Sequence, residues 1–142
     1  MKKNGVLSND VYNLLRKTTP FCNIDLILIK NNNFLLGKRI IKHYENYWSL
    51  PGGRILRDEK VKTAIKRIAF EECSCYIMKP KFVGVYENVT NYRHDINLTY
   101  MVSYVKGNPQ PDLQHSQLKW FSKIPTKTVP FQIKALKDAV II

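Results

Sequence analysis

The sequence lacks any apolar run that approaches the roughly 20 residues a helix needs to cross a bilayer. The lysines in its first segment, MKKNGVLSND, are not followed by the apolar stretch of a secretion signal. Cysteine is scarce and odd in number, at Cys22, Cys73 and Cys75, and Cys73-Ser74-Cys75 lacks the spacing and companion ligands of a zinc site. We therefore expect a cytoplasmic protein with reduced thiols and no membrane partner.

The sequence also lacks a basic arm, an internal repeat and a linker. Its 23 lysines and arginines outnumber 11 acidic residues, for a formal net charge of +12, but they are scattered from Lys2 to Lys137. The excess favours anionic ligands, whereas the scatter argues against a dedicated nucleic-acid tail, so we do not expect nucleic acid as the partner. At 142 residues and 44% hydrophobic content, the chain fits one domain, residues 1–142.

Hydrophobic spacing and turn signals predict alternating helices and strands. We expect helices at 8–16, at 59–73 with Asp58 as N-cap, and from about 130; strands at 21–29, 34–40, 76–89, 96–105 and 119–121; and a turn at 31–33. This order predicts an α+β fold, a layered α-β-α sandwich with a mixed sheet.

The helix predicted at 59–73 carries a carboxylate on its apolar face. On a helical wheel, Glu72 lies within roughly 40° of Val61, beside Ile65 and Ile68. An unpaired buried charge costs several kcal/mol, so Glu72 needs a partner. A hard divalent cation suits a carboxylate beside the Gly52-Gly53 turn, which makes a Mg²⁺ site the first hypothesis.

The spacing of Gly53, Glu59, Arg67, Glu71 and Glu72 resembles the Nudix box, the loop-helix motif that holds Mg²⁺ against a diphosphate in Nudix hydrolases. The resemblance implies a Nudix-type α-β-α sandwich. Two positions depart from the usual pattern: Ile68 stands where a glutamate follows the arginine, and Ser74 where a glycine ends the motif. In ordinary Nudix pyrophosphohydrolases that glutamate supplies a metal ligand or the general base.

One branch that also lacks this glutamate, the GDP-mannose mannosyl hydrolases, resembles the chain more closely. The similarity includes Thr18-Thr19-Pro20, Asp25, Phe34-Leu35-Leu36-Gly37-Lys38-Arg39, Tyr47-Trp48, Pro51-Gly52-Gly53-Arg54, Asp58-Glu59, Gly84-Val85, Tyr100 and Gln114-His115.

This resemblance implies a site and a reaction. Mg²⁺ would be held by the Gly52 carbonyl, Glu72 and Gln114, and His115 would be the general base. Arg39, Arg54 and Tyr100 would contact the leaving diphosphate, and Asp25 the substrate. The implied reaction is hydrolysis of a nucleotide sugar, GDP-mannose or a close analogue, by water attack at the anomeric carbon with release of GDP. The branch also implies a homodimer.

Several roles stay open at this point. Glu71 forms either an i,i+4 ion pair with Arg67 or a metal contact, and Glu59 is a ligand, a supporting carboxylate or a first-turn residue. Arg67 is expected to support the site, while His43 and His94 are rival bases. The alternative functions are a pyrophosphohydrolase that cleaves between phosphates and a catalytically degenerate Nudix domain that binds RNA or nucleotide.

Overall fold

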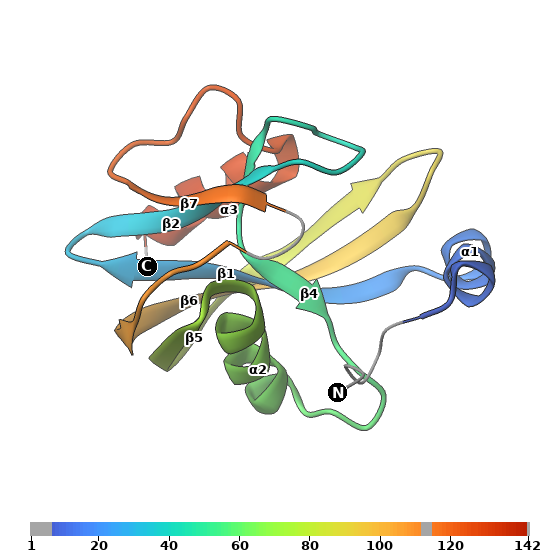
Figure 1. The fold of residues 1–142 in the computed structure, drawn as a ribbon, viewed down its shortest axis with the longest axis horizontal. Helices are drawn as coiled ribbons and strands as arrows, with labels where there is room; N and C mark the ends of the chain where they lie inside the picture. Colours follow the sequence, from blue (N-terminus) through green and yellow to red (C-terminus); the bar gives the residue numbers. More distant parts are fainter. Residues whose placement is uncertain (1–6, 112–114, 142) are drawn as a thin grey trace.

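The chain folds into a mixed sheet with helices on both faces, as the computed structural model of residues 7–111 and 115–141 shows (Figure 1). Its elements are α1 (Asn9–Thr18), β1 (Phe21–Lys30), β2 (Asn33–Arg39), β3 (Trp48–Ser49), β4 (Gly52–Arg54), α2 (Val61–Cys73), β5 (Cys75–Val89), β6 (His94–Gly107), β7 (His115–Phe121) and α3 (Pro130–Ile141). The α+β class expected from the sequence is confirmed. In the described part of the chain, no helix has the length and apolar character needed to cross a membrane.

The strand β1 lies in the middle of the sheet, whose main order is β3-β2-β1-β6-β5. It pairs antiparallel with β2 and β4 and parallel with β6, so the sheet is mixed. Successive side chains of a strand face opposite sides, and Leu26 and Leu28 pack in the core beside α2 whereas Ile27 packs in the core beside α3. The predicted α-β-α sandwich is therefore confirmed.

The cap predicted for the first helix and the turn predicted between the first two strands are both present in the structure. The backbone N–H of Val11 donates to Ser8 Oγ at 3.4 Å, which caps α1. Asn31 and Asn32 join β1 to β2 with left-handed φ angles of 51° and 64°, the conformation that a tight hairpin turn favours.

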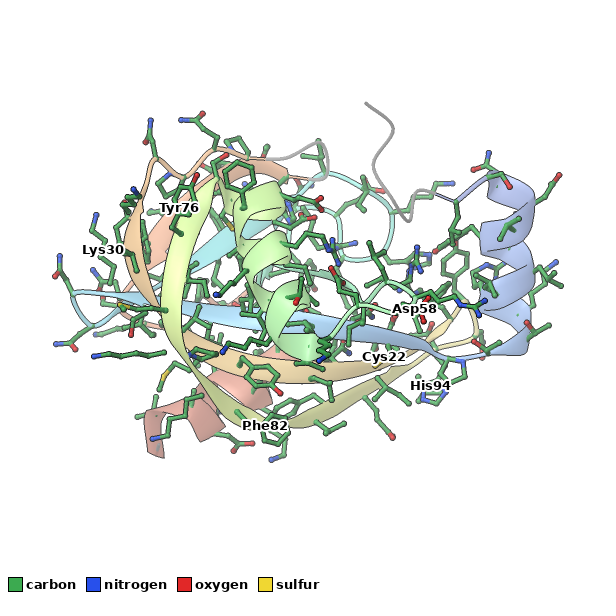
Figure 2. All side chains as sticks on the ribbon, turned by 90° about the horizontal axis from the view of Figure 1, so that it is seen from below. Cys22, Lys30, Asp58, Tyr76, Phe82 and His94 are labelled. Carbon is green, nitrogen blue, oxygen red and sulfur yellow. The ribbon has the colours of Figure 1, made fainter. Side chains whose placement is uncertain are left out.

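The start of α2 differs from the prediction. The helix begins at Val61 and not at Glu59, and its N-cap is Lys60, which makes no side-chain capping bond. Asp58 instead has a left-handed φ of 64° in the preceding loop (Figure 2). The physical reason is that the Glu59 carboxylate accepts the Leu56 N–H at 3.2 Å and binds Arg67, which holds this stretch as a loop.

Two strand predictions are also corrected. Gly52-Gly53 is not a plain turn but part of β4, where Gly52 lies opposite Asp25 of β1. The short strand expected at 119–121 begins four residues earlier, at His115, because it pairs with β2 from Phe34 to Arg39. At the other end of α2, Ser74 adopts the left-handed conformation itself (φ 54°, ψ 34°) and so ends the helix without glycine.

Candidate active site

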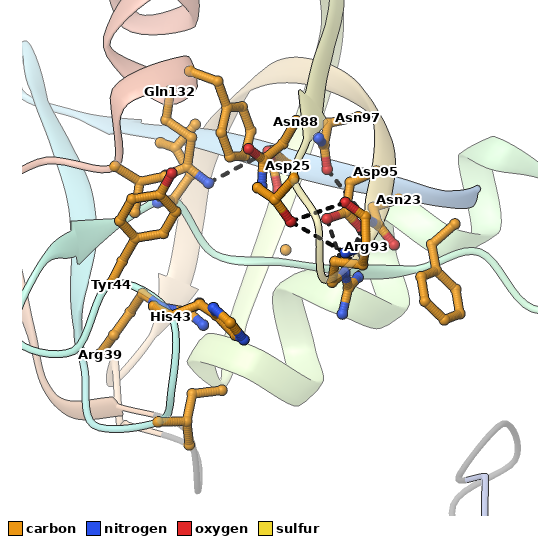
Figure 3. Close-up of a pocket in the computed structure, with 18 of the residues that line it drawn as sticks. Asn23, Asp25, Arg39, His43, Tyr44, Asn88, Arg93, Asp95, Asn97 and Gln132 are labelled. Carbon is orange, nitrogen blue, oxygen red and sulfur yellow. Dashed lines mark hydrogen bonds and ion pairs between the residues drawn. The ribbon is translucent and has the colours of Figure 1, made fainter. Parts of the chain in front are cut away.

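A cavity of about 640 Å³ opens at one end of the sheet (Figure 3). Its walls come from β1, β4, the loop after β2, the β5–β6 connection and the start of α3. Of the residues that the sequence proposes for a site, the cavity is lined by Asp25, Arg39, Gly52, Arg54 and His115. Residues distant in sequence thus converge at one place.

The floor of the cavity is polar because the inward positions of two parallel strands are polar. Asn23 of β1 lies beside Asn97 of β6 in the register, and Asp95 is opposite Phe21. Asn23 Nδ2 donates to Asp95 Oδ1 at 2.8 Å and to Asn97 Oδ1 at 3.2 Å. These contacts satisfy side chains that would otherwise be costly to bury.

Arg93 binds Asp95 within this floor. Its Nε donates to both Asp95 oxygens, at 3.0 and 2.9 Å, while its Nη1 donates to the Tyr12 hydroxyl at 3.0 Å. The carboxylate therefore balances this guanidinium, and Arg39 and Arg54, which also line the cavity, bring further positive charge that an anion would meet. Arg93 was not predicted as a site residue, because the Asp95 that it binds meets Asn23 only through the β1–β6 pairing.

Asp25 is buried at the inner end of this floor. Burial raises its pKa to about 7, the negative charge of Asp95 adds to the rise, and a hydrogen bond from Gln132 and the charge of Arg39 oppose it. Gln132 of α3 approaches with Nε2 at 3.5 Å from Asp25 Oδ2, and its Oε1 accepts the Leu50 N–H at 2.7 Å. Gln132 was not predicted as a site residue, because α3 meets β1 only in the folded chain.

Gly52 is glycine for a steric reason. A Cβ there would lie 2.3 Å from Asp25 Oδ1 and 2.7 Å from the Ile24 carbonyl oxygen. The sequence reading expected the close approach of an ion to this backbone; the approach that the structure shows is that of Asp25. A side chain at position 52 would displace the carboxyl group from the cavity wall.

His115 is buried, with 8% of its surface exposed, and is not the exposed loop residue that the pattern around it suggests by itself. Its Nε2 lies 3.3 Å from Ser49 Oγ on β3. Its ring lies against Gly37, where a Cβ would come within 2.7 Å of His115 Cδ2. Ser49 and Gly37 thus fix the ring at the cavity wall, and neither was singled out as a supporting residue from the sequence.

The two rival histidines lie elsewhere. His43 is exposed in the loop after β2, although it lines the cavity mouth. His94 begins β6, and among the described residues it is not part of the cavity wall. Burial and position both favour His115 as the histidine of the site.

Arg67 joins α2 to the loop before it. Its Nε donates to Glu59 Oε2 at 2.6 Å, its Nη1 to Glu71 Oε2 at 3.0 Å, and its Nη2 to the Arg54 carbonyl at 2.8 Å. The hydrogen bond from Arg67 holds the pKa of Glu59 below its usual value. Glu71 thus makes the i,i+4 ion pair, and Arg67 fixes the backbone next to Gly53.

Comparison with known proteins gives this loop-helix unit a family. The sequence profile of the NUDIX domain matches residues 22–136. The chain belongs to the Nudix hydrolase family. Among curated relatives, the low-salt glycan biosynthesis protein Agl8 of Haloferax volcanii is 25% identical over 123 residues, which are 81% of this chain and 79% of that protein.

Solved Nudix structures share the fold. A MutT NUDIX hydrolase from Burkholderia pseudomallei superposes with a TM-score of 0.77 at 24% identity, over 84% of this chain and 98% of that one. A NUDIX hydrolase from Nitrosomonas europaea gives 0.76 at 17% identity, over 87% and 90%. At these identities the likeness concerns the fold alone.

The Nudix helix of this chain carries oxygen donors that fit a hard cation. Glu72 is half-buried, its Oε2 atom is buried, and it follows Ile68 by one turn on the face that packs against Gly53. In the described ranges, no three His, Cys, Asp or Glu side chains converge, so a metal would need a mixed set with backbone or amide oxygens. Gln114, expected as a third ligand, lies outside the described residues.

Tyr100, like Glu72, is a predicted site residue that does not line the cavity in the described part of the chain. It packs against the apolar core on the α2 side of the sheet, with its ring centroid 5.3 Å from that of Phe82.

Proposed function

We propose that this Nudix protein is a Mg²⁺-dependent nucleotide-sugar hydrolase that releases a nucleoside diphosphate and the free sugar, with GDP-mannose as the first candidate substrate. The observation that carries the proposal is the pairing of two positions. Ile68 of the Nudix helix is an apolar core residue, 1% exposed, whereas His115 is held in the wall of the cavity. The helix supplies no base at position 68, and the cavity wall contains a histidine at position 115, to which we assign that role.

The residues around the cavity support substitution at a sugar carbon. Arg39 and Arg54 present planar guanidinium donors suited to the oxygens of a diphosphate. Mg²⁺, held by Glu72, the Gly52 carbonyl and Gln114, would neutralise charge on the leaving group when bound.

For the attacking water, His115 accepts the proton, and the contact between its ring and Ser49 orients that ring. Water attack opposite the diphosphate inverts the anomeric centre. A glycan biosynthesis protein among the relatives agrees with a sugar-containing substrate. The proposal retains the expectation of a cytoplasmic homodimer.

Hydrolysis of GDP-mannose in H₂¹⁸O tests the proposal. We expect GDP and mannose as products, with the label in mannose. Label in a phosphate group, with GMP and mannose 1-phosphate as products, would show pyrophosphohydrolase chemistry instead. A panel that includes UDP- and ADP-sugars in the same assay identifies the nucleobase that the substrate carries.

His115→Gln tests the assignment of the base. We expect turnover to fall by at least about a hundredfold, the usual contribution of a general base, while the affinity for Mg²⁺ measured by calorimetry changes little. His94→Gln is the matched control, because His94 is the rival histidine that, among the described residues, does not line the cavity. Normal turnover by His115→Gln, or an equal loss in the control, would reject His115 as the base.

A further inference from the structure

Arg39 faces the cavity from the end of β2, and its placement matters for any anionic substrate. Its side chain lines the cavity together with that of Asp25, whose pKa its positive charge lowers. A long side chain loses conformational entropy when it is held in one orientation, and a bidentate phosphate contact needs that orientation beforehand. The contacts that fix the Arg39 side chain therefore affect the affinity for the substrate.

One such contact comes from the loop that follows Arg39, residues 40–47. Arg39 Nε donates to the His43 carbonyl at 3.0 Å. Backbone bonds close the loop on itself, from Arg39 N–H to the Tyr47 carbonyl and from Asn46 N–H to the Arg39 carbonyl, at 2.9 and 2.8 Å.

The backbone of this loop is strained. His43, Tyr44 and Asn46 all have left-handed φ angles, of 65°, 62° and 65°. Non-glycine residues keep that conformation when surrounding contacts impose it. The loop therefore needs an external contact that fixes its shape.

That contact is a stack of three side chains, which we call the clasp: His43, Tyr92 and Arg16. The His43 and Tyr92 rings stack with centroids 4.3 Å apart and planes at 30°. The Arg16 guanidinium lies 4.2 Å from the Tyr92 ring centroid, and its Nη1 donates to the Tyr92 carbonyl at 2.7 Å. The clasp joins the loop after β2, the β5–β6 connection and α1 at the cavity mouth.

We propose that Tyr92 is a positioning residue for Arg39: its ring holds His43, and the His43 carbonyl in turn holds the guanidinium in the direction of the substrate diphosphate. Arg16 supports Tyr92 from α1, whose ten residues include none that is buried. The inference rests on the proposed function only in taking Arg39 as the diphosphate contact.

A double-mutant cycle tests this coupling, with the affinity for GDP in the presence of Mg²⁺ as the measurement. We expect Tyr92→Ala to weaken GDP binding about tenfold, a coupling within the range known for contacting residues. In an Arg39→Met background the same change should alter affinity by less than about twofold, because the residue through which Tyr92 acts is gone. Tyr92→Phe keeps the ring and should bind GDP like the wild type.

Tyr76→Ala is the control, since Tyr76 is a tyrosine with about half of its surface exposed that lies at the opposite end of the molecule from His94 (Figure 2). It should leave GDP affinity unchanged, and thermal unfolding of every variant checks that the fold is kept. Equal losses from Tyr92→Ala in both backgrounds would mean that the clasp only tethers α1, and no loss in either would also overturn the proposal. Failure of the proposed function is a separate result, because it appears in the ¹⁸O label and not in GDP affinity.

Discussion

At His115, the imidazole ring occupies the space that a side chain at position 37 would fill. Gly37 is on β2, opposite Leu118 and beside Ser49, so the cavity histidine is packed between two strands. This contact could not be predicted from the sequence, where Gly37 stands in a strand of apolar and basic residues. The role that we propose for His115 therefore requires a residue without a side chain at position 37.

Gly37→Ala should therefore impair catalysis more than folding. The added Cβ would sit 2.7 Å from His115 Cδ2, which forces the ring to move, and misplacement of a catalytic group by about 1 Å can cost up to a hundredfold in rate. We expect kcat to fall about ten- to a hundredfold, with at most about 3 kcal/mol lost from the free energy of unfolding.

Gly84→Ala is the control for Gly37→Ala. Its Cβ would lie 3.0 Å from the Tyr86 hydroxyl oxygen, a tight contact on β5 and away from His115. It should reduce stability and leave kcat unchanged. If both variants kept wild-type kcat, the ring position would not matter.

The cysteines provide a second prediction at this scale. Burial raises the pKa of Cys75 to about 11, and Cys73 is also buried, whereas Cys22 is exposed. Because the thiolate is the reactive form, iodoacetamide at pH 8 should label Cys22 in the folded protein and all three in denaturant. Peptide mass spectrometry reads the result, and labelling of Cys75 at the rate of Cys22 would contradict the buried placement.

At the scale of elements, α2 and its preceding loop form a unit clamped by Arg67. The sequence predicts much of this unit, because Ile65, Ile68 and Glu72 are local neighbours on one helix face. It fails at the helix start, where the Glu59–Arg67 bond overrides the capping tendency of Asp58. The bond between Glu59 and Arg67, eight residues apart, thus sets where the helix begins, and the capping propensity of Asp58 does not.

Arg67→Met should loosen this unit. It removes hydrogen bonds to Glu59, Glu71 and the Arg54 carbonyl, all partly exposed, so we expect a loss of about 2 kcal/mol in the free energy of unfolding and weaker Mg²⁺ binding. Denaturant unfolding in metal-free buffer and calorimetric Mg²⁺ titration measure the two effects.

Glu72→Gln is the counterpart, because it should weaken Mg²⁺ binding and activity and leave metal-free stability nearly unchanged. An Arg67→Met variant with wild-type stability would contradict the clamp. A Glu72→Gln variant that retained both Mg²⁺ affinity and activity would remove the proposed metal site.

At the scale of the molecule, the cavity floor needs strands that are far apart in the chain. Asn23 and Asp95 are 72 residues apart in sequence and meet because β1 pairs with β6 in parallel. Spacing along a sequence gives the faces of each strand but not which strands become neighbours. For that reason Asp25 was found as an unusual charge in an apolar strand, whereas Asn23, Arg93, Asp95 and Gln132 were missed.

Buried Asp25 should make the stability of the whole protein depend on pH. Its pKa is about 7 in the folded state against 3.8 as the ordinary value, so the folded state binds the proton more tightly. The free energy of unfolding should therefore fall as pH rises from about 4 to about 7, by up to about 4 kcal/mol from this group.

Asp25→Asn removes the titration and should flatten this part of the pH profile. Denaturant unfolding of both proteins in metal-free buffer from pH 4.5 to 8 measures the difference. Parallel profiles for the two proteins would show that the carboxyl group is ionised throughout this range in the folded state.

The alternation along β1 also limits the ways in which this chain can misfold. Asp25 lies between Ile24 and Leu26, which face the apolar layer beside α2. If β1 slipped by one residue against β6, the carboxyl group would enter that layer and isoleucine would face the cavity. The polar residues of the floor thus discriminate against the wrong strand register, and a lineage that exchanged them for a new ligand would also have to find another safeguard against mispairing.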